Sequence, residues 1–224
     1  MNDTQAFILQ QPQQAAQLIL LFHGVGATAQ SMAPLGLAYA QAFPQAMVVA
    51  LDSPYPSELA PGGRQWFSVT GITEENREQR VAAALPAFEY AVRYWQQRAG
   101  VDAAGTALVG FSQGAIMALA SALRPEPVAA RVIALAGRFA ALPEQPLHEN
   151  CTVHLLHGKT DAVMPYRHAI EGAMRLRTLG ADFTADVLPF VGHELHPELM
   201  ALAVEKLQQH IPARLWLQPG ETPD

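Results

Sequence analysis

The sequence predicts an α/β fold in which a mainly parallel sheet carries helices on both faces, and three observations predict it. Half of the 224 residues are apolar and the mean hydropathy is +0.08, so the chain can enclose a large core. Short apolar runs rich in β-branched residues recur along the chain, and helix-length segments separate them. Because parallel neighbours need crossover connections, this alternation indicates helices that cover the sheet on both sides.

Each element follows from this pattern in chain order. The apolar runs predict buried strands at Leu18–Phe22, Met47–Leu51, Ala107–Val109, Val132–Ala136, Val153–Leu156 and Phe183–Leu188. The segments between them predict helices at Ser31–Phe43, Glu74–Arg98, Gln113–Leu123, Pro165–Leu179 and Pro197–His210.

Three segments depart from simple alternation. The Gln-rich residues 10–17 indicate a turn between two strands. Pro86 lies inside the second helical segment, so we expect a kink or two shorter helices there, because proline lacks an N–H and clashes with the preceding turn. Residues 52–66 are rich in proline and glycine and predict a long loop of the kind that often carries binding residues.

The domain organisation follows from length and composition. We expect one α/β domain over residues 1–217, with a minimal cap or none, and a frayed polar tail at 218–224. The single cysteine, Cys151, cannot form an internal disulfide. The N-terminus lacks a basic region, and its apolar run of five residues is far below the roughly 20 needed to span a bilayer. We therefore expect a cytoplasmic protein without integral membrane association.

Charge and histidine spacing exclude two function classes. Twenty acidic residues against 14 basic ones give a net charge of −6, and no Lys/Arg run is longer than one residue, so a nucleic-acid partner is not expected. His193 and His196 lack the spacing of a zinc protease helix, since position 197 is proline. His154 and His157 are three apart on a strand, which sends their side chains to opposite faces. We expect no metal and no cofactor.

The motif Gly110-Phe111-Ser112-Gln113-Gly114 points to nucleophilic catalysis. It matches G-x-S-x-G directly after a predicted strand and directly before a predicted helix. A serine in such a tight turn adopts strained backbone geometry and exposes its hydroxyl above the sheet edge. The alternative is a turn of small residues that packs closely on a helix.

A serine nucleophile needs a base, and the base needs an acid to orient it. Asp161 follows the strand Val153–Leu156, and His193 follows the strand Phe183–Leu188, with Gly192 before it to allow a sharp turn. The resulting order of Ser, Asp and His along the chain is that of α/β-hydrolases. These residues are the expected acid and base.

Each assignment has an alternative. Asp161 could instead cap the helix that begins near Pro165, in which case Asp182 or Asp186 would be the acid. His196 could replace His193, although its position before a proline is more typical of a helix cap.

The same chemistry needs backbone donors for an oxyanion. The N–H of Gln113, the residue after the nucleophile, is one donor by the construction of the turn. The loop Phe22–Gly26 follows the first predicted strand, and its glycines leave N–H groups facing the site, so Val25 is the expected second donor. A plain glycine turn is the alternative for this loop.

Several segments together resemble the acyl-protein thioesterase, or phospholipase/carboxylesterase, group of small α/β-hydrolases. The matching segments are LFHGVG at 21–26, RQWFSV at 64–69, GFSQGA at 110–115, HGKTDAVMP at 157–165 and VGHELHPE at 191–198. They span most of the chain. One departure is Ala27, where members of the family often carry aspartate.

The resemblance implies the same site as the residue patterns. It makes Ser112 the nucleophile, Asp161 the acid, His193 the base, and the amides of Val25 and Gln113 the oxyanion donors. It also implies that Trp66 and Met164 line an acyl pocket, although aromatic residues and methionine mostly fill cores.

The expected function is a serine esterase that cleaves carboxylic esters, and in the same way thioesters, through an acyl-enzyme. Its expected partner is a small ester or acyl substrate. The alternative is a non-catalytic binding protein on the same fold.

Overall fold

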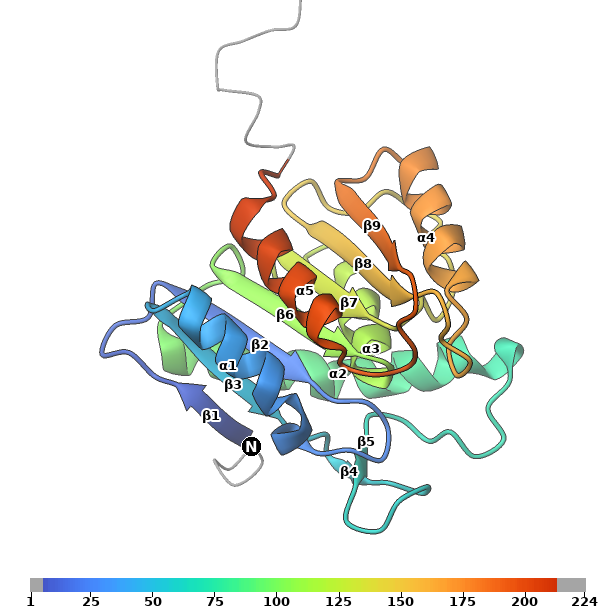
Figure 1. The fold of residues 1–224 in the computed structure, drawn as a ribbon, viewed down its shortest axis with the longest axis horizontal. Helices are drawn as coiled ribbons and strands as arrows, with labels where there is room; N and C mark the ends of the chain where they lie inside the picture. The colour runs from blue at the N-terminus through green and yellow to red at the C-terminus, as the bar shows by residue number, and fades with distance from the viewer. Residues whose placement is uncertain (1–5, 213–224) are drawn as a thin grey trace, which may run out of the picture.

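A seven-stranded sheet forms the centre of the computed structural model, which describes residues 6–212 (Figure 1). The strand order is β1-β3-β2-β6-β7-β8-β9, and all neighbours are parallel except β1, which runs antiparallel to β3. The strands are β1 (Ala6–Gln10), β2 (Gln17–Phe22), β3 (Ala46–Leu51), β6 (Thr106–Phe111), β7 (Arg131–Leu135), β8 (Thr152–Gly158) and β9 (Phe183–Leu188). A separate small hairpin pairs β4 (Tyr55–Pro56) with β5 (Arg64–Gln65).

Helices cover both faces of the sheet. The helices are η2 (Ala29–Met32), α1 (Ala33–Ala42), α2 (Glu74–Ala99), α3 (Gln113–Ala122), α4 (Arg167–Thr178) and α5 (Pro197–Gln209). One face carries α1 and α5, and the other carries α2, α3 and α4 (Figure 1). No helix among the described residues is both long enough and apolar enough to cross a bilayer.

The two cores follow from the period of two along each strand. In β2, Leu18, Leu20 and Phe22 pack in the core under α2, α3 and α4. Ile19 and Leu21 point the other way and pack under α1 and α5. Because both faces are covered, the strand is a continuous apolar run. The predicted α/β class, with a mainly parallel sheet between helical layers, is therefore confirmed.

The segment between Gln10 and Gln17 joins the two strands β1 and β2, as the sequence predicted, although β3 lies between them in the sheet. One detail of the prediction is wrong: of the two outcomes expected at Pro86, a division into two helices does not occur, since α2 runs as one helix through it. Residues on both sides of the proline, such as Val81 and Trp95, are buried against the sheet, and that burial offsets the missing backbone hydrogen bond.

The predicted long loop at 52–66 contains β4 and β5, which form the small hairpin between β3 and α2. The predicted C-terminal tail at 218–224 lies outside the described residues. Because β2, β6, β8 and β9 are parallel, their carboxyl ends meet at one edge of the sheet. The loops that leave this edge carry the candidate site.

Candidate active site

Ser112 occupies the sharp turn between β6 and α3. Its backbone has φ 53° and ψ −113°, a conformation that non-glycine residues rarely adopt. The flanking glycines allow this close approach: a Cβ added to Gly110 would lie 2.4 Å from the amide nitrogen of Ala115, and one added to Gly114 would lie 2.2 Å from the carbonyl oxygen of Phe22. Strained geometry at Ser112 therefore depends on glycine at both positions.

His193 connects Ser112 to Asp161. Its Nε2 lies 2.9 Å from Ser112 Oγ, and its Nδ1 lies 2.7 Å from Asp161 Oδ2. A carboxylate can only accept a hydrogen bond, so Nδ1 carries the proton. In the neutral ring Nε2 then presents its lone pair to the serine hydroxyl. This is the arrangement in which the imidazole can accept the hydroxyl proton.

Asp161 is held rigidly beneath His193. Its side chain is fully buried, and Oδ1 accepts the N–H groups of Val163 at 2.9 Å and Met164 at 2.7 Å. His157 Nε2 lies 3.3 Å from Asp161 Oδ2 and donates its hydrogen to the carbonyl oxygen of Met164 at 2.6 Å. Burial lowers the pKa of His157 and favours the neutral ring.

The loops that carry Asp161 and His193 are hydrogen-bonded to each other. The carbonyl oxygen of Val191 accepts the Thr160 N–H at 3.0 Å and its hydroxyl at 2.8 Å. The sharp turn before His193 lies at Phe190, with φ 61°, and not at Gly192 as the sequence suggested. The Phe190 side chain lies on the surface, where 91% of the residue is exposed.

The alternative acids and base lie elsewhere. Asp182 accepts the Thr152 hydroxyl at 2.7 Å, and Asp186 pairs with Lys206 at 2.9 Å. His196 caps α5 by accepting the N–H of Glu198, which is the role expected from its place before a proline. The structure thus brings together Ser112, Asp161 and His193 and leaves the three alternatives in structural contacts.

Both expected oxyanion donors lie beside Ser112. A Cβ added to Gly24 would come within 3.3 Å of Ser112 Cβ, so the loop that carries Val25 lies against Ser112. Within residues 6–212, the Val25 N–H has no hydrogen-bond acceptor. Gln113 is the first residue of α3, where an N–H has no partner within the helix. Two N–H groups are therefore available to a ligand at Ser112.

Trp66 and Met164, the expected pocket residues, occupy different settings. Trp66 is 2% exposed, and its indole N–H donates to the carbonyl oxygen of His23 at 2.9 Å. It lines a cavity of about 510 Å³ between the β4–β5 hairpin and α2, whose walls also include Tyr55 and Phe67. Met164 is half-buried and lies next to Asp161 through its backbone.

The side chain of Gln113 has a role that the sequence analysis missed. Its Oε1 accepts the Trp66 N–H at 2.7 Å, and its Nε2 donates to the Phe67 carbonyl oxygen at 2.8 Å. The main-chain segment after β5 is thereby fixed to the turn that carries Ser112. The only available signal was an amide side chain at a position where the motif itself demands no particular residue.

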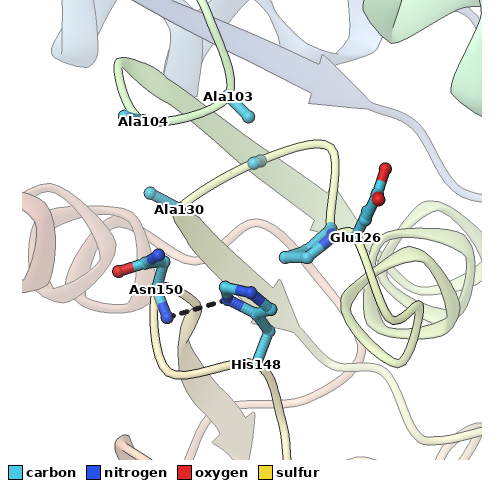
Figure 2. A pocket seen from close by; sticks show the side chains of 8 residues that line it. Ala103, Ala104, Glu126, Ala130, His148 and Asn150 are labelled. Atoms are coloured by element: carbon cyan, nitrogen blue, oxygen red, sulfur yellow. Dashed lines mark hydrogen bonds between the residues drawn. The ribbon is translucent and has the colours of Figure 1, made fainter.

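A second hollow lies at the opposite edge of the sheet. A cavity of about 410 Å³ is bounded by the loops that precede β6, β7 and β8, and Figure 2 shows Ala103, Glu126 and His148 around it. Its one drawn hydrogen bond joins the Asn150 N–H to His148 Nδ1 at 3.1 Å. None of its lining residues comes from the loops around Ser112. Within the described chain, no group of His, Cys, Asp and Glu side chains is arranged to hold a metal ion.

Comparisons with known proteins identify the relatives of this chain. The profile of a family described as phospholipase/carboxylesterase matches residues 3–211. The chain is 47% identical over 208 residues to esterase YpfH of Escherichia coli strain K12, covering 92% of this chain and 88% of that protein.

Solved structures show the same fold. The crystal structure of esterase PE8 superposes with a TM-score of 0.79 at 28% identity, covering 88% of this chain and 93% of that one. A carboxylesterase from Mesorhizobium loti gives a TM-score of 0.72 at 19% identity, covering 88% and 90% of the two chains. At that identity the second match supports the fold alone.

Proposed function

The chain belongs to the phospholipase/carboxylesterase family and is an esterase, and we propose that it cleaves carboxylic esters through Ser112, His193 and Asp161. One observation carries the proposal: the unbroken relay from Ser112 Oγ to His193 Nε2 at 2.9 Å and from His193 Nδ1 to Asp161 at 2.7 Å. Thioesters are the second substrate class, since attack on either carbonyl uses the same groups.

In the first half of the reaction the enzyme becomes acylated. Ser112 Oγ forms a bond to the carbonyl carbon while its proton moves to His193 Nε2 and the carbonyl electron pair moves to oxygen. The N–H groups of Val25 and Gln113 bind this oxyanion. Asp161 accepts from Nδ1–H and stabilises the imidazolium that forms.

The intermediate then collapses. The carbonyl re-forms, the bond to the leaving oxygen or sulfur breaks, and the proton on His193 Nε2 goes to the leaving group, which departs as an alcohol or thiol. Water next takes the place of the Ser112 hydroxyl, gives its proton to Nε2 and attacks the acyl-enzyme. Collapse of the second intermediate returns the proton to Ser112 Oγ and releases the carboxylic acid.

The same proposal includes the setting of the reaction. Trp66 and Met164 are assigned to the acyl pocket, supported by the cavity beside Trp66 and by the backbone bond between Met164 and Asp161. Residues 1–217 are proposed to act as one unit, since every long strand described belongs to a single sheet. A cytoplasmic location is proposed on the basis of the single, buried Cys151.

The direct test combines turnover with covalent labelling. Purified protein is incubated with p-nitrophenyl esters of increasing chain length, and with a thioester whose released thiol is detected with a disulfide reagent. A fluorophosphonate probe is then added, and the modified peptide is identified by mass spectrometry. We expect hydrolysis that stops as the probe attaches to Ser112, because the relay makes this hydroxyl nucleophilic.

Two serine variants provide the comparison. Ser112→Ala should lose turnover and labelling while keeping the fold. Ser121→Ala, in the helix that follows Ser112, should keep both, because the buried Ser121 hydroxyl donates only to the carbonyl oxygen of Ala118. Absence of turnover and labelling in the wild type would contradict the proposal and favour a binding protein on this fold.

A further inference from the structure

We infer that His23 is a positioning residue for the reaction: its Nδ1–H fixes the Gly24–Val25 peptide so that the Val25 N–H is presented at Ser112. This inference rests on the proposed function, because Val25 matters only if an oxyanion forms there. The sequence placed His23 in the loop Phe22–Gly26 but gave its side chain no role. Its side chain is completely buried directly after β2.

The hydrogen bonds of His23 define its tautomer. The N–H of Ser53, on the loop after β3, donates to His23 Nε2 at 3.1 Å. A backbone N–H can only donate, so Nε2 must offer a lone pair and the ring hydrogen must be on Nδ1. From there it donates to the carbonyl oxygen of Gly24 at 2.7 Å.

The charged groups around the ring leave it neutral. Asp52 Oδ1 is 4.0 Å from Nε2 and accepts the Ala29 N–H at 2.7 Å instead. The guanidinium of Arg64 donates to the carbonyl oxygens of Ser53 and Pro54. Burial lowers the pKa of His23 from its usual range, so the neutral form is favoured in the folded protein.

The peptide geometry transmits this contact to Val25. Every described peptide bond is trans, so the carbonyl of Gly24 and the N–H of Val25 point in opposite directions. Holding the carbonyl oxygen toward the buried ring therefore turns the Val25 N–H away from it. The Ala27 N–H also donates to the Gly24 oxygen, but at 3.2 Å, so His23 makes the shorter of the two contacts.

His23 is itself fixed to the nucleophile turn. The Trp66 indole N–H donates to the His23 carbonyl oxygen at 2.9 Å, and the Trp66 backbone N–H donates to the side chain of Gln113 at 2.7 Å. The indole and imidazole rings lie 5.5 Å apart. One hydrogen-bonded path thus joins Gln113, which carries one proposed oxyanion donor, to the ring that orients the other.

Two amide variants separate the two contacts of the ring. In His23→Asn the amide nitrogen takes the place of Nδ1 and can still donate to the Gly24 oxygen. In His23→Gln the longer side chain brings its amide oxygen to the place of Nε2, where it can accept the Ser53 N–H, and the donor to Gly24 is lost. Because Asn is one methylene smaller than Gln, lost volume alone would affect His23→Asn more, so a larger fall in kcat for His23→Gln reports the Nδ1–H contact.

We expect His23→Gln to lower kcat by roughly 10-fold to 100-fold with KM within about twofold, since complete loss of one oxyanion donor lowers kcat by about 10² to 10³. His23→Asn should retain kcat within about threefold. Binding of a trifluoromethyl ketone, which forms the tetrahedral adduct, should weaken in proportion to kcat/KM in His23→Gln. A merely structural role would instead lower the thermal midpoint of both variants and leave the kcat of the folded fraction unchanged.

The wild type provides a test that does not depend on either variant folding. Long-range ¹⁵N–¹H spectra should show His23 as the Nδ1–H tautomer, and the Nε2–H tautomer would overturn the inference. Equal kcat values for the two amide variants would overturn it as well. If the wild type hydrolyses esters but shows either of these results, the role of His23 is refuted and the proposed function stands. An inactive wild type would refute both the proposed function and this inference.

Discussion

Replacing Asp161 by Asn should lower kcat by about four orders of magnitude while the protein remains folded. Asp161 Oδ1 accepts two backbone N–H groups, from Val163 and Met164, and only an oxygen can do this. The amide oxygen of Asn must therefore occupy that place, and its NH₂ group must face His193 Nδ1. The hydrogen bond that Nδ1 now donates to Oδ2 at 2.7 Å would be reversed.

The reversal changes the tautomer of the base. With Nδ1 as the acceptor, the ring hydrogen of His193 moves to Nε2, which lies 2.9 Å from Ser112 Oγ and can then no longer take the hydroxyl proton. Loss of the carboxylate charge also removes the stabilisation of the imidazolium. Such a reversal in a serine triad lowers kcat about 10⁴-fold, which corresponds to about 5.5 kcal/mol of transition-state stabilisation.

The assay measures kcat on a short p-nitrophenyl ester, with near-ultraviolet circular dichroism to verify the fold. The matched control is Asp182→Asn, because Asp182 was the rival acid and binds Thr152 and His210 instead. The control should keep kcat within about twofold. A loss of less than 10-fold in Asp161→Asn, or a larger loss in Asp182→Asn, would refute the assignment of the acid.

Three further perturbations follow from the same structure. Val25→Pro removes the N–H of the proposed oxyanion donor and should lower kcat by roughly 10²-fold or more in steady-state assays; full activity would exclude Val25 as a donor. Gly114→Ala places a Cβ 2.2 Å from the Phe22 carbonyl oxygen and should lower the midpoint of urea unfolding sharply. Gly192→Ala places a Cβ that meets nothing within 4 Å, at an ordinary φ, and should leave the midpoint unchanged. Equal midpoints for the two variants would contradict this prediction. Burial lowers the pKa of His154 to about 2. Below pH 6.5 the unfolded chain therefore takes up a proton on this ring while the folded protein does not, and the free energy of unfolding falls as the pH falls. Between pH 7 and pH 5 the free energy of unfolding should fall by about 2 kcal/mol more in the wild type than in His154→Leu. Equal falls in the two proteins would disprove this prediction.

The sequence by itself determined the class of fold and predicted the sharp turn that carries Ser112. Successive side chains of a strand point to opposite faces, and this local property assigns Leu20 to one core and Leu21 to the other. G-x-S-x-G is equally local, because the sharp turn at Ser112 needs glycines at fixed offsets in the chain. Such signals can be read without knowing which strands are neighbours.

Choosing among the candidate partners of Ser112 required the folded chain. Asp161 follows β8 and Asp182 precedes β9, and only Asp161 lies within hydrogen-bond distance of His193. The position of Gly192 suggested the sharp turn, but the backbone makes it at Phe190. Both outcomes depend on how the loops after β8 and β9 bond to each other, which no spacing along the chain records.

The tertiary structure also decided what buried groups do. Pro86 stays within one helix because the residues on both sides of it are buried against the sheet, a gain that helix propensity does not include. Trp66 and His23, 43 residues apart in the chain, meet through an indole N–H and a carbonyl oxygen. Local sequence determines which backbone conformations and which faces of an element are favourable. Reactive groups are positioned to within tenths of an ångström by contacts between distant segments. Those contacts exist only after packing has brought the segments together.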